Sequence, residues 1–67
     1  MTWTAILGID YEADRPCVGD VLLSCGDLVT LGDQTLRVER GMDGGWILLD
    51  EQGQPRPGWW TMATIDL

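Results

Sequence analysis

The chain has 67 residues and a formal net charge of −7, from eleven Asp and Glu residues against four Arg, with no Lys and no His. A chain of this length forms one domain with a thin core, since small domains bury only about 60% of the surface that the unfolded chain exposes. Without His or Lys there is no Ser-His or Cys-His nucleophile pair, no His-containing zinc site and no Schiff-base lysine. We therefore expect a single domain over residues 1–67 that is not an enzyme and holds no cofactor or metal.

Glycine and proline interrupt the sequence so often that short strands are favoured over helices. Residues Thr2–Ile9 alternate with a period of two, which predicts the first strand. A polar loop over Asp10–Pro16 follows, and the β-forming run Val18–Leu23 predicts the second strand. After a turn at Ser24–Gly26, the run Asp27–Leu31 predicts the third strand.

Two hairpin turns organise the next part of the chain. Gly32-Asp33 is a two-residue turn signal, which predicts that the third strand pairs with a fourth over Gln34–Arg40. Asp43–Gly45 is a second turn signal, followed by a strand over Trp46–Asp50.

The chain ends in a polar loop over Glu51–Gly58 and a strand over Trp59–Leu67. Short strands with turns at this spacing are typical of small sandwiches and barrels. A strongly bent sheet is the better solution for so short a chain, because near-closure also hides the edge strands. We expect an all-β domain with a small, strongly bent antiparallel sheet of five to six strands.

Three stretches resemble a known architecture: Val18-Gly-Asp-Val-Leu-Leu, Gly32-Asp-Gln-Thr-Leu-Arg-Val and Asp43-Gly-Gly-Trp-Ile-Leu-Leu. This pattern, over about half of the chain, resembles the SH3-like small-barrel superfamily of bacterial proteins and implies a partly open SH3-like barrel. Small barrels host many functions, so the resemblance concerns the fold. In size and acidity the chain also resembles small phage-encoded inhibitors of bacterial defence, including anti-CRISPR proteins.

The densest acidic segment has carboxylates at alternate positions: Asp10, Glu12 and Asp14. In an extended segment they would lie on one face, about 6.7 Å apart, which is of the order of the phosphate spacing along a nucleic-acid strand. Such a row would occupy a basic nucleic-acid groove on another protein. Asp20, Asp27 and Asp33 would extend it if their turns gather at the same end of the barrel. The alternative is a solvated acidic loop that only keeps the protein soluble.

Four tryptophans replace the absent phenylalanine as large side chains. Trp3 and Trp46 fall on apolar positions of predicted strands and are expected in the core. Trp59 and Trp60 are adjacent and would point to opposite faces of a strand, so one is expected in the core and the other outside. The outer Trp would either anchor a partner or cover the neighbouring proline loop.

Cys17 and Cys25 are expected to be free thiols that behave as small buried apolar residues. The predicted strand between them would hold their Cα atoms farther apart than the limit of about 7 Å for a disulfide.

These features predict a non-enzymatic acidic protein that blocks or docks on a basic, nucleic-acid-binding surface of a partner protein, as an anti-CRISPR-type inhibitor acting by nucleic-acid mimicry would. The expected partner-binding residues are Asp10, Glu12, Asp14, Asp20, Asp33, Trp59 and Trp60. The alternative is a structural or assembly module in a phage or bacterial complex, with contacts from the exposed Trp and from Met62, Ile65 and Leu67.

The charge and the hydropathy also predict where the protein acts. Direct nucleic-acid binding needs a basic surface that displaces counterions, and anionic membranes attract basic segments, so neither partner is expected. No stretch approaches about 18 consecutive apolar residues, and no basic start of a signal peptide is present. We expect a monomer or weak homodimer in the cytoplasm, which would be the host cytoplasm for a phage protein.

Overall fold

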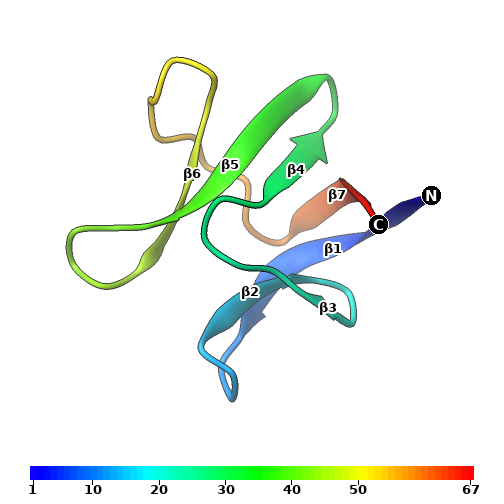
Figure 1. The fold of residues 1–67 in the computed structure, drawn as a ribbon, viewed down its shortest axis with the longest axis horizontal. Coiled ribbons are helices and arrows are strands. Elements are labelled where there is room, and N and C mark those ends of the chain that lie inside the picture. Colours follow the sequence, from blue (N-terminus) through cyan, green and yellow to red (C-terminus); the bar gives the residue numbers. More distant parts are fainter.

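The computed structural model describes residues 1–67 as one antiparallel sheet of seven short strands (Figure 1). The strands are β1 (Thr2–Asp10), β2 (Arg15–Val18), β3 (Val21–Leu22), β4 (Leu28–Leu31), β5 (Gln34–Arg40), β6 (Trp46–Leu49) and β7 (Thr61–Asp66). Their order across the sheet is β3-β2-β1-β7-β4-β5-β6, so β3 and β6 are edge strands and the sheet is not closed into a barrel. The predicted all-β class with an antiparallel sheet is confirmed.

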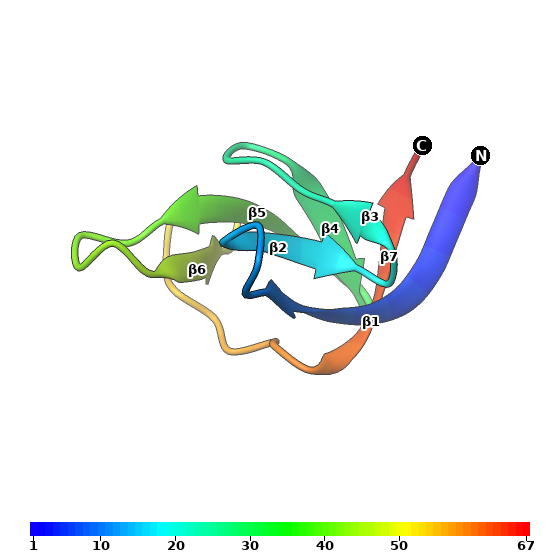
Figure 2. The same cartoon turned by 90° about the horizontal axis from the view of Figure 1, so that it is seen from below.

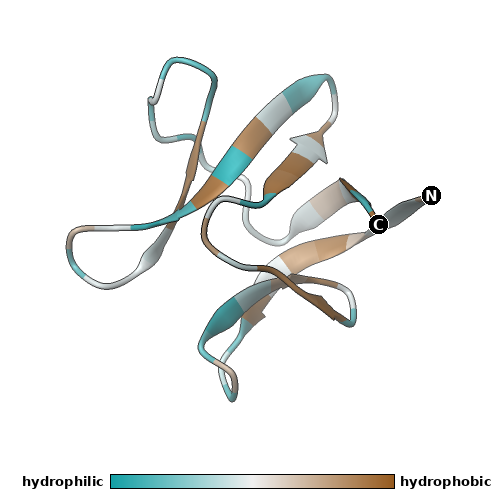
Figure 3. Cartoon of the chain, viewed as in Figure 1, coloured by the Kyte–Doolittle hydropathy of each residue, from teal (hydrophilic) through white to brown (hydrophobic).

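One face of the sheet carries all of the core except Leu23, which follows β3, because alternate side chains of a strand point to the same side. The core residues are Leu7, Val18, Leu23, Val29, Leu36, Val38, Leu48, Ala63 and Ile65. Figure 3 shows apolar colour concentrated on the strands and polar colour on the turns and loops. The Cα radius of gyration is 10.8 Å, as expected for a folded chain of this length.

The strand predicted over Val18–Leu23 is in fact split by a turn. Gly19 has a φ of 60°, and its amide donates a hydrogen bond of 3.0 Å to the carbonyl of Ile6. The chain therefore reverses after β2, and β3 folds back along it. In addition, β2 begins at Arg15, inside the predicted loop Asp10–Pro16. The split gives seven strands where five to six were predicted.

Both predicted hairpins are confirmed. Gly32-Asp33 joins β4 to β5, and the segment that contains Asp43–Gly45 joins β5 to β6. The last strand is shorter than the predicted Trp59–Leu67, because Trp60 has a φ of 65° and the extended backbone begins only at Thr61.

The first and last strands of the chain pair in the middle of the sheet. β1 and β7 are in register from Thr2 opposite Asp66 to Leu7 opposite Thr61. The two ends of the chain consequently lie side by side (Figure 2), and the amide of Leu67 donates a hydrogen bond of 2.7 Å to the carbonyl of Met1. The structure contains no helix, and therefore none long and apolar enough to cross a membrane.

Several side chains differ from their predicted burial. Trp3 is 40% exposed rather than in the core, although its indole N–H donates a hydrogen bond of 3.0 Å to the carbonyl of Val18. Trp46 is partly buried and packs against the core. Both cysteines are free thiols, but the predicted reason is wrong, because the strand between them is broken; Cys25 is exposed and Cys17 is half-buried.

Candidate functional site

The acidic segment after β1 is a tight turn and not the predicted extended row. Asp10 is the last residue of β1, and its Oδ1 accepts hydrogen bonds from the amides of Glu12 at 3.0 Å and Ala13 at 3.2 Å. Side-chain acceptance of this kind stabilises a turn in place of an extended backbone. Asp14 completes the turn with a φ of 53°. The three carboxylates therefore do not form a row on one face of a strand.

Asp14 contacts the β5–β6 hairpin instead of standing free. Its Oδ2 lies 3.1 Å from Nη2 of Arg40, and its carbonyl accepts a hydrogen bond of 3.2 Å from the indole N–H of Trp46. The Arg40 guanidinium also lies over the Trp46 ring, 4.2 Å from the centroid, and donates to the carbonyl of Gly44. Asp14 is therefore engaged by Arg40 in an exposed ion pair at the β5–β6 hairpin.

Asp20 and Asp33 occupy two other turns, and both are exposed without an ion pair. Asp20 lies in the β2–β3 turn and Asp33 in the β4–β5 turn. Figure 1 places the β4–β5 turn far from the β1–β2 turn, at opposite ends of the view. The condition under which these acids would extend one patch, that their turns gather at one end of the domain, is therefore not met.

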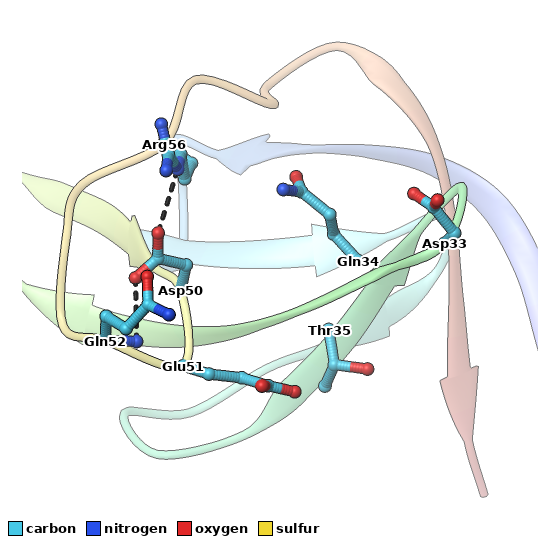
Figure 4. A pocket seen from close by; sticks show the side chains of 7 residues that line it. All are labelled: Asp33, Gln34, Thr35, Asp50, Glu51, Gln52 and Arg56. Atoms are coloured by element: carbon cyan, nitrogen blue, oxygen red, sulfur yellow. Dashed lines mark hydrogen bonds and ion pairs between the residues drawn. The ribbon is translucent and has the colours of Figure 1, made fainter.

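A polar pocket of about 250 Å³ lies between the β4–β5 hairpin and the loop after β6 (Figure 4). Its lining residues are Asp33, Gln34, Thr35, Asp50, Glu51, Gln52 and Arg56. Asp50 organises the loop: Oδ1 accepts the amides of Gln52 and Gln54 at 2.9 Å each, and Oδ2 accepts Nε of Arg56 at 2.9 Å. These bonds, that of the Gln54 amide most of all, hold the pKa of Asp50 below its usual value.

The two adjacent tryptophans are placed on different sides, as predicted, although they precede β7 and are not part of it. Trp59 is partly buried and packs against the core, whereas Trp60 is 63% exposed. The Trp60 ring lies over Gly8 of β1, where an added Cβ would meet its Cζ3 at 2.6 Å. The exposed Trp therefore covers Gly8 of the sheet.

All four arginines are engaged by other groups of the protein. Three form ion pairs with carboxylates at 2.8–3.1 Å: Arg37 with Glu39, Arg40 with Asp14 and Arg56 with Asp50. The fourth, Arg15, donates to the carbonyl of Leu23 and the hydroxyl of Ser24. The N-terminal amine lies 3.7 Å from Asp66. Seven carboxylates are left without an ion pair: Asp10, Glu12, Asp20, Asp27, Asp33, Asp43 and Glu51.

Sequence reasoning named Met62 as a possible contact residue but missed Ile6, which is exposed beside it on the face of the sheet opposite the core. Ile6 of β1 and Met62 of β7 are directly opposite each other in register and are 49% and 53% exposed. The signal was present in the sequence, because Ile6 stands at a position of β1 whose alternation calls for a polar residue.

No group of three or more His, Cys, Asp or Glu side chains is arranged to hold a metal ion. No family model matches the sequence, and comparisons with curated proteins and with solved structures find no similar protein. The resemblance to SH3-like small barrels therefore stays a prediction.

Proposed function

We propose that this protein is a non-enzymatic acidic binding protein that docks on a basic, nucleic-acid-binding surface of a partner protein and blocks it. The observation that supports this proposal is that the positive side chains are paired within the protein whereas most of the negative ones are not. Every arginine is held by an internal partner, while seven carboxylates have no ion pair. An uncompensated field of one sign attracts surfaces of the opposite sign and speeds their association.

The proposed mimicry of a nucleic acid does not depend on a linear row of carboxylates. Because the segment from Asp10 to Asp14 is a turn, the negative charge is presented from several turns of the domain. A partner that normally holds a curved or folded polyanion would meet such a distribution, and the protein would compete with the nucleic acid for the same basic residues.

The experiment uses four carboxylates that form neither an ion pair nor a side-chain hydrogen bond: Glu12, Asp20, Asp33 and Glu51. The variant Glu12→Gln, Asp20→Asn, Asp33→Asn, Glu51→Gln removes their charge and breaks no contact of the fold. The wild-type protein and this variant are immobilised and exposed to bacterial lysate at low salt.

We expect the wild-type protein to retain nucleic-acid-binding proteins that duplex DNA or added salt releases, and the variant to retain far less. The proposal is overturned if nothing is retained at low salt, if the variant retains the same proteins equally well, or if salt and DNA release none of them.

The second candidate function is an assembly module in a phage or bacterial complex. The exposure of Met62 and Leu67, at 53% and 60%, favours it, although Ile65, which was also expected to form contacts, is buried in the core. Sedimentation velocity at micromolar concentration tests self-assembly: a defined oligomer supports this candidate, and a strict monomer counts against it.

A further inference from the structure

The face of the sheet opposite the core carries an apolar patch where β1 pairs with β7. Ile6 and Met62 are opposite each other in register, and Trp60 lies over Gly8, the next position of β1 on the same face. Across β2 the same row continues to Leu22 of β3, which is 39% exposed. We call Ile6, Leu22, Trp60 and Met62 the outer patch.

The position of Trp60 is fixed by the backbone around it. A positive φ is rare for a bulky residue, and Trp60 is held there by a hydrogen bond of 2.6 Å from its amide to the carbonyl of Leu7. The indole covers Gly8, and only glycine leaves room for it at that distance. A large aromatic ring that is exposed and yet held in place loses little entropy on binding and makes a strong anchor.

Two carboxylates without an ion pair lie at the margin of the outer patch. Asp10 follows Gly8 on the same face of β1. Asp20 is next to Gly19, whose amide donates a hydrogen bond to the carbonyl of Ile6 in β1. Cys17 is opposite Gly8 in register. Its pKa is raised first by its own burial and then by the negative charges of Asp10 and Asp20. The apolar patch therefore lies within electrostatic reach of both carboxylates.

Resting on the proposed function, we propose that the outer patch with Asp10 and Asp20 is the docking surface, and that it takes a partner surface with an apolar centre and Lys or Arg side chains around it. Contiguous exposed apolar side chains mark interaction sites on small soluble proteins, and the carboxylates at the margin select the charge of the partner. A second copy of this chain fits less well, because a two-fold contact would bring the same unpaired carboxylates against each other.

The probe is a synthetic cationic amphipathic peptide of Lys and Leu, compared with an oligolysine peptide of equal charge. Each is titrated at low salt into the isotope-labelled protein, and amide chemical shifts are followed by NMR. We expect the Lys–Leu peptide to bind at least about tenfold more tightly than oligolysine, which corresponds to roughly one buried anchor side chain. Its shifts should centre on Ile6, Trp60 and Met62.

Matched variants separate the apolar part from the charged part. Trp60→Ala and Met62→Thr should each weaken binding of the Lys–Leu peptide about tenfold or more and leave oligolysine unaffected. The control is Met42→Ala, because Met42 is fully exposed but lies in the β5–β6 turn. Gly8→Ala should act like Trp60→Ala, because the added Cβ displaces the indole.

The carboxylates are tested at constant net charge. Asp10→Asn with Asp20→Asn should weaken binding of the Lys–Leu peptide more than Asp33→Asn with Glu51→Gln, which removes the same charge elsewhere. Asn at position 10 keeps an oxygen to accept the turn amides, so the fold is preserved.

The outcomes distinguish this inference from the proposed function. If both peptides bind equally and Trp60→Ala has no effect, the docking surface is wrong and the acidic binding function stands. If neither peptide binds at low salt, both are overturned. If sedimentation shows a dimer that Trp60→Ala or Met62→Thr dissociates, the occupant is a second copy and the proposed partner chemistry is wrong.

Discussion

The two cysteines illustrate how local environment sets the reactivity of a residue. Burial, together with the charges of Asp10 and Asp20, raises the pKa of the Cys17 thiol, whereas Cys25 is exposed. A raised pKa lowers the fraction of thiolate, which is the reactive form. With iodoacetamide at mildly alkaline pH, we expect the Cys17→Ser variant to be alkylated several-fold faster than Cys25→Ser, by mass spectrometry. Equal rates in the folded state would contradict this; in urea the rates should converge.

The lowered pKa of Asp50 predicts how the stability of the protein depends on pH. Because hydrogen bonds from Gln54, Gln52 and Arg56 lower its pKa in the folded protein, its contribution is present above the unfolded carboxyl pKa of about 3.9. It is lost as the pH falls through the lower folded value. The free energy of urea unfolding is measured at pH 7 and at a series of acidic pH values. Asp50→Asn should be less stable than wild type at pH 7, and its free energy of unfolding should fall less on acidification. Asp33→Asn, which removes an exposed carboxylate that accepts no hydrogen bond, is the control and should not lower the stability at pH 7.

At the scale of elements, Arg40 joins the β1–β2 turn to the β5–β6 hairpin. It pairs with Asp14, lies over the Trp46 ring and donates to the β5–β6 turn. Exposed ion pairs contribute little alone, and an exposed cation–π contact adds about 0.5–1 kcal/mol. We therefore expect Arg40→Ala to lower the free energy of urea unfolding by about 1 kcal/mol. Arg37→Ala, which loses only an exposed pair with Glu39, should cost less; an equal loss would show that the two turns are not coupled.

The elements that could be predicted from the sequence are those fixed by neighbouring residues. The alternation of Gln34–Arg40 and the Gly32-Asp33 turn define the β4–β5 hairpin locally, and both were placed correctly. Gly19-Asp20 is the same dipeptide as the turn Gly32-Asp33, but it was included in a strand because Val18 and Val21 on either side of the pair favour β structure. The late start of β7 could not be seen, since nothing in a Trp-Trp pair signals a left-handed backbone.

The candidate site was less predictable, because it depends on contacts between distant segments. Local spacing does not predict the ion pair between Asp14 and Arg40, which are 26 positions apart in the sequence. Nor does it predict that Trp60 covers Gly8. Periodicity placed Trp3 on the core face of β1, but this end of the strand pairs only with β7 and extends past β2, and the ring is 40% exposed.

For the whole molecule, the excess of carboxylates predicts a response to salt. Repulsion among seven unpaired carboxylates opposes folding, and salt screens it. The three arginine pairs lose strength too, but exposed pairs contribute little. We expect Tm to rise with sodium chloride. In a domain of this size, an increase of about 1 kcal/mol in the free energy of unfolding corresponds to a rise in Tm of roughly 4–8 °C. The variant lacking the charges of Glu12, Asp20, Asp33 and Glu51 should start higher and rise less; a Tm that falls with salt would contradict the explanation.

The pairing of β1 with β7 also decides when folding can be completed. The central pair of the sheet joins residues near the two ends of the chain, so a growing polypeptide can pair β1 with β2 but lacks its second partner until β7 has been synthesised. A topology dominated by such distant contacts has a high contact order and folds in milliseconds to seconds rather than microseconds. Stopped-flow refolding, followed by tryptophan fluorescence, should therefore show a slow main phase. Removal of β7 should abolish folding altogether, because β1 would then become an open edge and the sheet would divide into two three-stranded units, β3-β2-β1 and β4-β5-β6.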